Sequence, residues 1–326
     1  MASCSGGGSS AKGKKSPEIT MTLKADSGKG LSVKLRGEGK AAINWGDGSP
    51  VDSLDIKPYN SGKHTYAQAG EYTLKITGPS ITTLECTSLK LTNLEVSNYP
   101  ALTVLECYNN QLTSLDLSKN TALAELNVNQ NLLTSLDVSN NTALKYLACG
   151  TNQLTSLDVS SITGLEELHC GANQFTSIDV SNNTALINFS CSSTQLTGLD
   201  VSKNLLLKEL TCDMNKLTAI DVSKNSALER LICSFNKITT IDISRNPAMK
   251  IVTCMDNPLT DIVLGNHPKL SSMILYRTQL SAQALNTLFA SLPANDVNDK
   301  TIGISGVLGA DACNRSIATQ KGWIVK

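Results

Sequence analysis

A repeat of fixed length constrains this fold more than any other feature of the sequence. The repeat is 21 residues long, and its leading apolar residue recurs in ten registers without an insertion or deletion: Ile81, Leu102, Leu123, Leu144, Leu165, Leu186, Leu207, Leu228, Met249 and Leu270. The stretch 144–159 has the full pattern, LxxLxCxxNxLxxLDV. Units of constant length indicate one structural step each, stacked on the next.

The spacing inside each unit predicts two short strands. Leu147 and Cys149 lie two residues apart, as do Leu157 and Val159, so each pair faces one side of an extended segment. Neither pair can bury its apolar face alone, and neighbouring coils must therefore stack about 4.8 Å apart. We expect a mainly β solenoid with two short parallel strands per coil.

The LxxLxCxxNxL pattern over residues 81–280 resembles that of bacterial leucine-rich repeat proteins, in a short variety with a second, nested LxxLDV. The resemblance implies a leucine-rich repeat solenoid that binds proteins or other macromolecules on its concave strand face. A strand at LDV on the other side would reduce the curvature, so we expect a shallow concave face.

An asparagine column follows the first strand of the repeat. An inward amide there can pair with backbone groups of buried turns on adjacent coils. The column consists of Asn110, Asn131, Asn152, Asn173, Asn215, Asn236 and Asn257, with Thr194 once.

Eight of the 10 cysteines occupy the third apolar position of the repeat, which Val128 and Leu275 fill in two other coils. Because this position accepts Val and Leu, we expect a buried ladder of inert thiols. In-register side chains point the same way, which argues against a disulfide framework, and a straight column cannot converge on zinc. The ladder consists of Cys86, Cys107, Cys149, Cys170, Cys191, Cys212, Cys233 and Cys254.

Composition excludes several classes of function. Lys+Arg and Asp+Glu are both 28, so no basic excess favours nucleic acid. Only three histidines are present, none with an evident carboxylate partner in the sequence, and GxSxG, HExxH, GxxxxGK and CxxC are absent. We therefore expect a protein that is not an enzyme and has no cofactor and no metal site.

Residues 1–18 are rich in Gly, Ser and Lys and are expected to form a flexible tether. Cys4 follows Ala2-Ser3 and precedes the Gly/Ser stretch, which resembles the end of a bacterial lipoprotein signal. The resemblance implies lipidation of Cys4 and an exported protein at the bacterial cell surface or outer membrane. No apolar run of about 18 residues exists, so the lipid would be the only contact with a membrane.

Residues 19–78 alternate apolar and polar side chains between turns, which is typical of a small β-sandwich. The segments Ile43–Gly48 and His64–Tyr66 resemble a PKD-type domain, a module of extracellular bacterial proteins. We expect Asp47 to accept N–H groups of its own turn instead of binding a metal.

The repeats occupy residues 79–280, and residues 281–326 are expected to form a C-terminal α/β cap. Ser281 is a good N-cap for a helix that buries Leu285, Leu288, Phe289 and Leu292 and ends at Pro293. A strand over 301–305, a helix over 310–320 and a strand over 323–325 complete the expected cap.

The two strands of the repeat differ in how much they vary. On the second strand Thr recurs at every step from Thr92 to Thr260, and a carboxylate recurs at every step from Glu95 to Asp242. Identical positions cannot recognise a ligand of defined shape, and we expect turn hydrogen bonds and nearby cations to offset the repulsion between these carboxylates. The outward positions of the first strand change from acidic to apolar along the chain.

We expect the variable first strand to bind a ligand. The candidate residues are Tyr108, Glu125, Tyr146, Glu167, His169, Arg230, Ile232, Ile251, Met255, Ile274 and Tyr276. The last residues would form an exposed apolar patch, unless the cap covers it, and His169 is expected to be an ordinary surface histidine.

These features predict a monomeric, non-catalytic binding or adhesion protein whose partner is a protein or peptide. A glycan-binding module for polysaccharide is an alternative, although the candidate tyrosines Tyr108, Tyr146 and Tyr276 are dispersed in the sequence. A structural spacer is a third.

Overall fold

The first strand of each repeat forms a parallel ladder in the computed structural model, which describes residues 17–295 and 297–326. The pairing keeps the repeat in register, with Leu147 between Leu126 and Leu168. The strands are β9 (Val104–Glu106), β10 (Glu125–Asn127), β11 (Tyr146–Ala148), β12 (Glu167–His169), β13 (Asn188–Ser190), β14 (Glu209–Thr211), β15 (Arg230–Ile232), β17 (Ile251–Thr253) and β19 (Ser272–Ile274).

The inward positions of this ladder form one continuous core. Cys149, Cys170 and Cys191 have no exposed surface, and all eight thiols of the cysteine ladder are buried and free. Burial raises the pKa of these thiols, that of Cys149 to about 12, so they remain protonated at neutral pH. The expected ladder of packed thiols is confirmed. Each fully buried leucine of the same core stabilises the folded chain by about 1.5–3 kcal/mol.

The asparagine column pairs with the main chain of two coils at once. The Asn152 Nδ2 atom donates to the carbonyl oxygens of Val128 and Cys149, both at 3.0 Å, and its Oδ1 accepts from the Leu133 N–H at 3.0 Å. Thr151, just before it, has left-handed backbone with φ +53°, and the same geometry recurs in the other coils. That turn directs the amide inward, as the sequence predicts.

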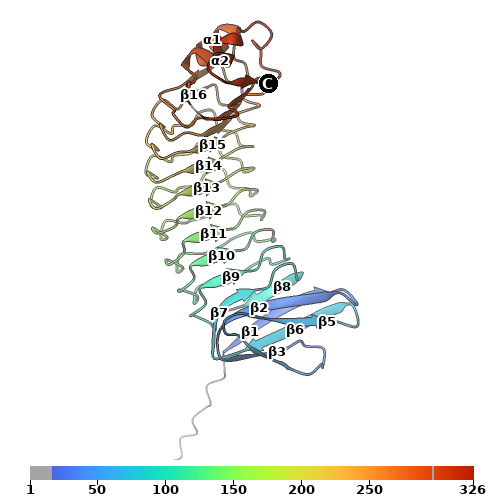
Figure 1. Ribbon diagram of the computed structural model, residues 1–326. Helices are drawn as coiled ribbons and strands as arrows, with labels where there is room; N and C mark the ends of the chain where they lie inside the picture. The colour runs from blue at the N-terminus through green and yellow to red at the C-terminus, as the bar shows by residue number, and fades with distance from the viewer. Residues whose placement is uncertain (1–16, 296) are drawn as a thin grey trace, which may run out of the picture.

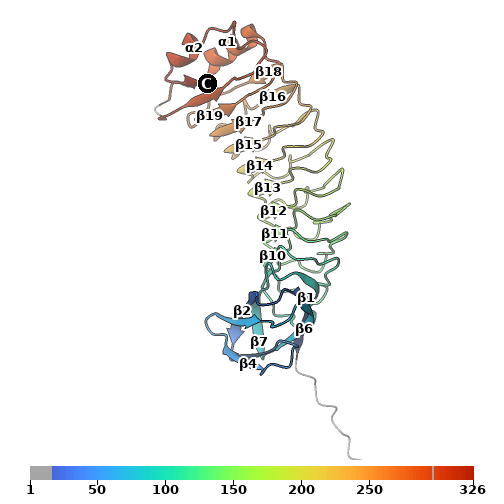
Figure 2. The same cartoon turned by 90° about the vertical axis from the view of Figure 1, so that its right-hand side faces the viewer.

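The second segment of the repeat is a regular strand in few coils. Among the described residues, this segment pairs in three places. The first is β8 (Leu91–Glu95), which pairs antiparallel with an N-terminal strand, and the second is β16 (Thr240–Asp242) with β18 (Asp261–Val263). The third is a single bridge of Asp200 with Asp221. The expectation of two parallel strands in every coil is therefore corrected. Figure 2 shows the reason: the solenoid curves with its strand ladder on the inner side, which spreads the coils on the convex side.

Side chains close the convex turns in place of a ladder. The Ser160 N–H donates to Asp158 Oδ1 at 2.9 Å. A second buried amide column, not noticed in the sequence, crosses between coils: Asn141 Nδ2 donates to the carbonyl oxygens of Leu117 at 3.1 Å and Asn120 at 2.9 Å. The turn hydrogen bonds expected for the carboxylate column are thus present.

The chain before the repeats forms strands that join the first coil directly (Figure 1). One sheet has the order β4-β3-β6-β1-β8, and β5 and β2 extend the solenoid ladder through β7. The two groups of strands therefore share one core with the repeats. Their bounds are β1 (Glu18–Ala25), β2 (Gly30–Glu38), β3 (Lys40–Asn44), β4 (Asp52–Asp55), β5 (Asn60–Thr65), β6 (Gly70–Thr77) and β7 (Ser80–Glu85).

Asp47 lies in a turn of this region. Its Oδ1 accepts from the Ser49 N–H at 3.1 Å, as expected, and its Oδ2 lies 2.7 Å from His64 Nε2. Hydrogen bonds from Ser49, supported by His64, lower the pKa of Asp47 to about 2.

The C-terminal segment continues the ladder with β20 (Thr301–Gly303) and β21 (Ile324–Val325). Helix α1 (Ala282–Ser291) begins as expected, because the Ser281 hydroxyl accepts from the Ala284 N–H at 3.1 Å. The helix expected over 310–320 is reduced to α2 (Ser316–Thr319). Turns precede α2, and Asn314 Oδ1 accepts from the Ser316 N–H at 3.2 Å, a local side-chain bond that competes with extending the helix backwards.

Candidate functional site on the strand face

The strand ladder forms the concave side of the solenoid (Figure 2), and every candidate residue of the described chain lies along or beside it. Tyr108 and Glu125 are exposed, and the other nine are partly exposed. Cys4, the candidate for lipidation, lies outside the described residues. The strand face divides into an acidic end near β9 to β12 and an apolar end near β15 to β19.

At the acidic end the structure brings together residues that are separated in the sequence. The rings of Tyr146 and His169 have centroids 5.6 Å apart, and His169 Nε2 lies 3.6 Å from Glu167 Oε2. His169 is partly exposed, and Tyr146 and Glu167 are its neighbours on the strand face. Stacking adjacent coils brings Tyr146 and His169, 23 residues apart in the sequence, into contact.

The carboxylates at this end affect one another. Partial burial raises the pKa of Glu106, and the neighbouring carboxylates of Glu85 and Glu125 raise it further. Burial also raises the pKa of Tyr146, with contributions from nearby glutamates. The acidic end is therefore a region of negative charge that favours cationic groups.

A shallow hollow of about 440 Å³ opens beside Tyr108 and His169. Three of its lining residues, Gly150, Gly171 and Ser192, are small. Later coils carry the larger Met255 and Tyr276 at the same position of the repeat. The small residues were missed in the sequence, although their small size in a variable column was the available signal. The lining includes Asn127, Asn129, Gly150, Gly171 and Ser192.

At the apolar end Ile232, Ile251, Met255, Ile274 and Tyr276 all remain partly exposed. The C-terminal segment supports them without burying them. A Cβ added at Gly303 would lie 2.4 Å from a ring carbon of Tyr276, so the tyrosine ring lies directly over this glycine of β20.

Two further apolar residues extend this end, and neither is among the residues that the sequence predicts. Met214 is 54% exposed and Phe235 is 44% exposed, and both occupy the left-handed turn position that precedes the asparagine column. The turn geometry projects the side chain outward, which explains the exposure. We define the apolar patch as Met214, Ile232, Phe235, Ile251, Met255, Ile274 and Tyr276.

Ion pairs lie at the margins of the apolar patch. Arg277 pairs with Asp256 through two hydrogen bonds, at 2.7 and 2.5 Å, and Lys250 pairs with Glu229 at 2.5 Å. Arg230, the remaining candidate, begins β15 beside Ile251 of the next strand. A polar margin around an apolar centre is the usual arrangement of a protein-binding surface.

Within residues 17–295 and 297–326, no group of three or more His, Cys, Asp or Glu side chains is placed to hold a metal ion. In the same described ranges, no helix has both the length and the apolar character needed to cross a membrane.

Comparisons with known proteins place this architecture. No protein-family model matches the chain, and no curated protein matches it. Among solved structures, the functional domain of InlJ from Listeria monocytogenes, described as including a cysteine ladder, is 32% identical with a TM-score of 0.59. The match covers 74% of this chain and 57% of that one, so the chain spans little more than half of that structure.

Two more distant structures share the fold. The internalin inlF of Listeria monocytogenes is 22% identical, with a TM-score of 0.50, over 75% of this chain and 86% of that one. FLRT2, solved in an octameric complex with Latrophilin 3 and Unc5D, is 18% identical, with a TM-score of 0.54, over 67% and 77%. The chain thus has the β-solenoid fold of bacterial leucine-rich repeat proteins.

Proposed function

We propose that this protein is a non-catalytic extracellular binding or adhesion protein that presents its strand face to a protein or peptide partner. The observation that carries the proposal is the apolar patch, where neighbouring coils leave Met214, Phe235 and five partly exposed candidates on one surface. Exposed apolar patches with a polar margin are typical of protein contact sites. FLRT2, a protein of similar fold, was solved in a complex with other proteins.

The position of the patch also favours a macromolecular partner. It extends over the edges of β14, β15, β17 and β19 and therefore along several coils. Aromatic and methionine side chains are enriched at such surfaces, and tyrosine is one of the residue types that most often dominate their binding energy. The acidic end would then contact basic groups of the same partner and increase its association rate.

Capture by the immobilised full chain tests the proposal. The probe is a detergent extract of surface-biotinylated cells from the environment of the source bacterium. The variant carries Ile232→Ala, Ile251→Ala and Tyr276→Ala, and the control carries Val263→Ala. Val263 is 44% exposed on β18 of the convex side, so it matches the patch in character but not in place.

We expect the parent and the Val263→Ala control to retain the same biotinylated protein and the triple variant to lose it, with binding weakened at least tenfold. Equal capture by all three chains would contradict a role of the patch. If neither capture nor any cell-surface phenotype responds to the triple variant, the chain acts as a structural spacer.

A polysaccharide is a second candidate because of the hollow at the acidic end. Amide side chains and Ser192 line a shallow depression beside Tyr108, and Tyr146 contacts His169 at its edge. Aromatic and amide groups together are suited to the apolar and polar faces of sugars. Glycan-array binding that Tyr146→Ala abolishes, while the apolar-patch variant retains it, would favour this candidate.

The same proposal includes a place for the chain. We propose that it is exported to the bacterial surface, held by a lipid on Cys4, with residues 1–18 as tether, 19–78 as a PKD-like sandwich, 79–280 as repeats and 281–326 as cap. Mass spectrometry of the protein from its own host tests the lipid, and an unmodified Cys4 would remove the anchor. Sedimentation equilibrium tests the expected monomer.

A further inference from the structure

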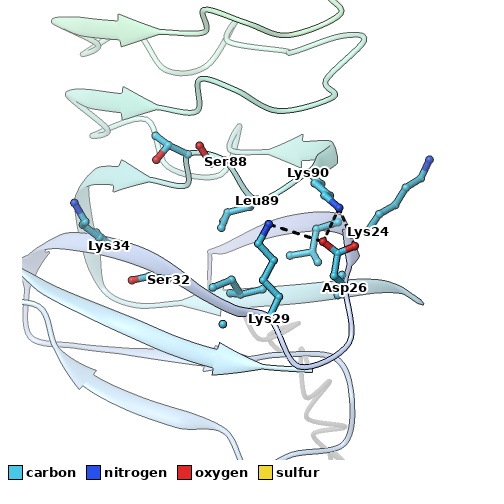
Figure 3. Close-up of a pocket in the computed structure, with 13 residues that line it drawn as sticks. Lys24, Asp26, Lys29, Ser32, Lys34, Ser88, Leu89 and Lys90 are labelled. Carbon is cyan, nitrogen blue, oxygen red and sulfur yellow. Dashed lines mark hydrogen bonds and ion pairs between the residues drawn. The ribbon is translucent and has the colours of Figure 1, made fainter. Parts of the chain in front are cut away.

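A pocket lies where the N-terminal strands meet the first coil (Figure 3), far along the molecule from the apolar patch. It has a volume of about 270 Å³ and is lined by the end of β1, the start of β2 and residues 87–90 between β7 and β8. Leu23 and Leu89 are buried beneath it, and Leu31 is partly exposed. The floor of the pocket is therefore apolar.

One wall of the pocket is a strand edge. Strand β2 pairs with β5 from Gly30 onwards, but with β7 only from Lys34 onwards. Beyond Glu85 the chain bonds to the next coil instead, where the Cys86 N–H donates to the Glu106 carbonyl at 2.8 Å. In the described chain, residues 30–33 thus have no neighbouring strand on the pocket side. Such an edge can pair with a short extended segment of another chain.

Lysines surround the opening. The lining contains Lys24, Lys29, Lys34 and Lys90 and one carboxylate, Asp26. Lys34 bonds Glu85 at 3.0 Å just outside the lining, so four lysines and two carboxylates leave a formal charge of +2. This excess favours an anionic ligand.

Two of these ammonium groups converge at one side of the opening. Figure 3 shows Lys90 and Lys29 directed at Asp26, with Lys90 Nζ 2.8 and 2.6 Å from the two carboxylate oxygens and Lys29 Nζ 3.9 Å from one of them. Lys90 has left-handed backbone, φ +56°, whereas the equivalent Gln111 of the next coil does not. The backbone of a lysine is thus held in a disfavoured region beside the pocket.

We propose that this pocket binds the C-terminal carboxylate of a peptide whose last side chain is apolar. The strand edge pairs with the peptide main chain, the leucine floor receives the side chain, and Lys29 and Lys90 hold the carboxylate. A free phosphate or a simple fatty acid would use only part of this arrangement, because neither has a main chain to pair with residues 30–33.

Isothermal titration calorimetry with the full chain tests the proposal. The probe is acetyl-Gly-Ser-Val-Leu with a free carboxylate, and the matched probe is the same peptide ending in an amide. We expect the free acid to bind at least tenfold more tightly, and its affinity to fall as salt is added. Lys29→Gln should weaken binding of the acid about tenfold, and Leu31→Asp should abolish it.

Controls separate binding from folding and from non-specific charge. Lys29 is exposed and only distantly paired, so Lys29→Gln should leave the thermal unfolding curve unchanged. Lys40→Gln, an exposed lysine of β3 outside the pocket, should leave binding unchanged. Equal affinity for acid and amide, or no heat at millimolar peptide, would overturn the proposal. Binding of hexanoate without binding of the peptide would also overturn it and would identify the occupant as a free aliphatic acid.

Discussion

The strand face and the convex face of the same coils are held together in different ways. On the strand face, main-chain hydrogen bonds between parallel strands join each coil to the next, and the side chains point away from those bonds. On the convex face most of the described coils lack such a ladder, and side chains such as Asp158 and Asn141 close the turns. Residues whose side chains hold the coils or turns together recur from repeat to repeat, whereas residues whose side chains make no such bonds vary. Repetition here marks the scaffold, and variation marks the candidate site.

Acid should have the largest effect, because it acts on all the convex carboxylates together. Each aspartate of the convex column accepts hydrogen bonds from the serine that follows it by two residues. These bonds lower the pKa of the aspartates below the usual 3.8, as for Asp116, Asp179, Asp200 and Asp221. The unfolded chain therefore binds more protons than the folded chain in this range. Stability should be complete above pH 3.8 and should fall as pH decreases through the lowered values, as measured by urea unfolding.

One convex position should respond at higher pH. In the last coil Val263 stands where the convex carboxylate column would have an aspartate. Buried His267 stands where the second amide column, that of Asn141, would have an asparagine. His267 Nε2 accepts from the Gly265 N–H at 3.0 Å, and its Nδ1 lies 3.0 Å from the Asn246 carbonyl oxygen. Burial lowers the pKa of His267 below 6.5. Its contribution is therefore present above pH 6.5 and is lost as pH falls below it. His267→Asn should remove this step and leave the step below pH 3.8, and a step that survives it would contradict the assignment.

Loss of one buried amide should be the most damaging single change. Asn152→Ala leaves the Val128 and Cys149 carbonyls and the Leu133 N–H each short of one buried bond. We expect a loss of about 3 kcal/mol or more in the free energy of unfolding. Asn140→Ala, at an exposed asparagine, is the control and should change it by less than about 0.5 kcal/mol. Similar values for the two variants would mean that the column does not hold adjacent coils together.

The sequence predicts the regular parts of this molecule well because the repeat has a single length. One coil determines the inward direction of Leu147, Cys149 and Asn152, and the structure confirms all three. The second strand was overpredicted, because LDV has the spacing of a strand whether or not neighbouring coils approach closely enough to pair. Curvature is a property of the whole stack and is not visible in one unit.

The candidate site was harder to predict for a related reason. The contact of His169 with Tyr146, the glycine beneath Tyr276 and the exposure of Phe235 all depend on neighbours 21 or more residues away or on a left-handed turn. Aligning the repeats reveals which positions vary. It does not reveal which of them are half-buried by an adjacent coil.

A single convex carboxylate should matter less than a buried amide. Asp158→Ala removes the acceptor of the Ser160 N–H on a solvent-exposed turn. Water can replace that bond, so we expect a small loss of stability, well below that of Asn152→Ala. Thermal unfolding followed by circular dichroism measures it. An unchanged unfolding curve would show that the repeated carboxylates serve another purpose and would reopen ligand binding on that face.

Restoring the asparagine column should stabilise the chain slightly. The Thr194 hydroxyl lies 3.1 Å from the Cys191 carbonyl oxygen and 2.6 Å from Asn215 Oδ1. In the described chain it makes no bond to the Cys170 carbonyl, which its longer counterparts would reach. Thr194→Asn should therefore add about 1 kcal/mol. Thr194→Val, which only removes the hydroxyl, should have the opposite sign, and a destabilising Thr194→Asn would mean that the turn has no room for the amide.

The smallest effect should come from the strand face itself. Thr211 is the partly exposed last residue of β14, and its main-chain pairing to β13 and β15 does not involve its side chain. Thr211→Val keeps the shape and the β-branched character, so we expect a change of less than about 0.5 kcal/mol in the free energy of unfolding. The comparison is with Asn152→Ala, which changes an inward amide three coils earlier. If Thr211→Val cost as much as the loss of an inward amide, strand-face side chains would be structural, and their variation could no longer be attributed to recognition.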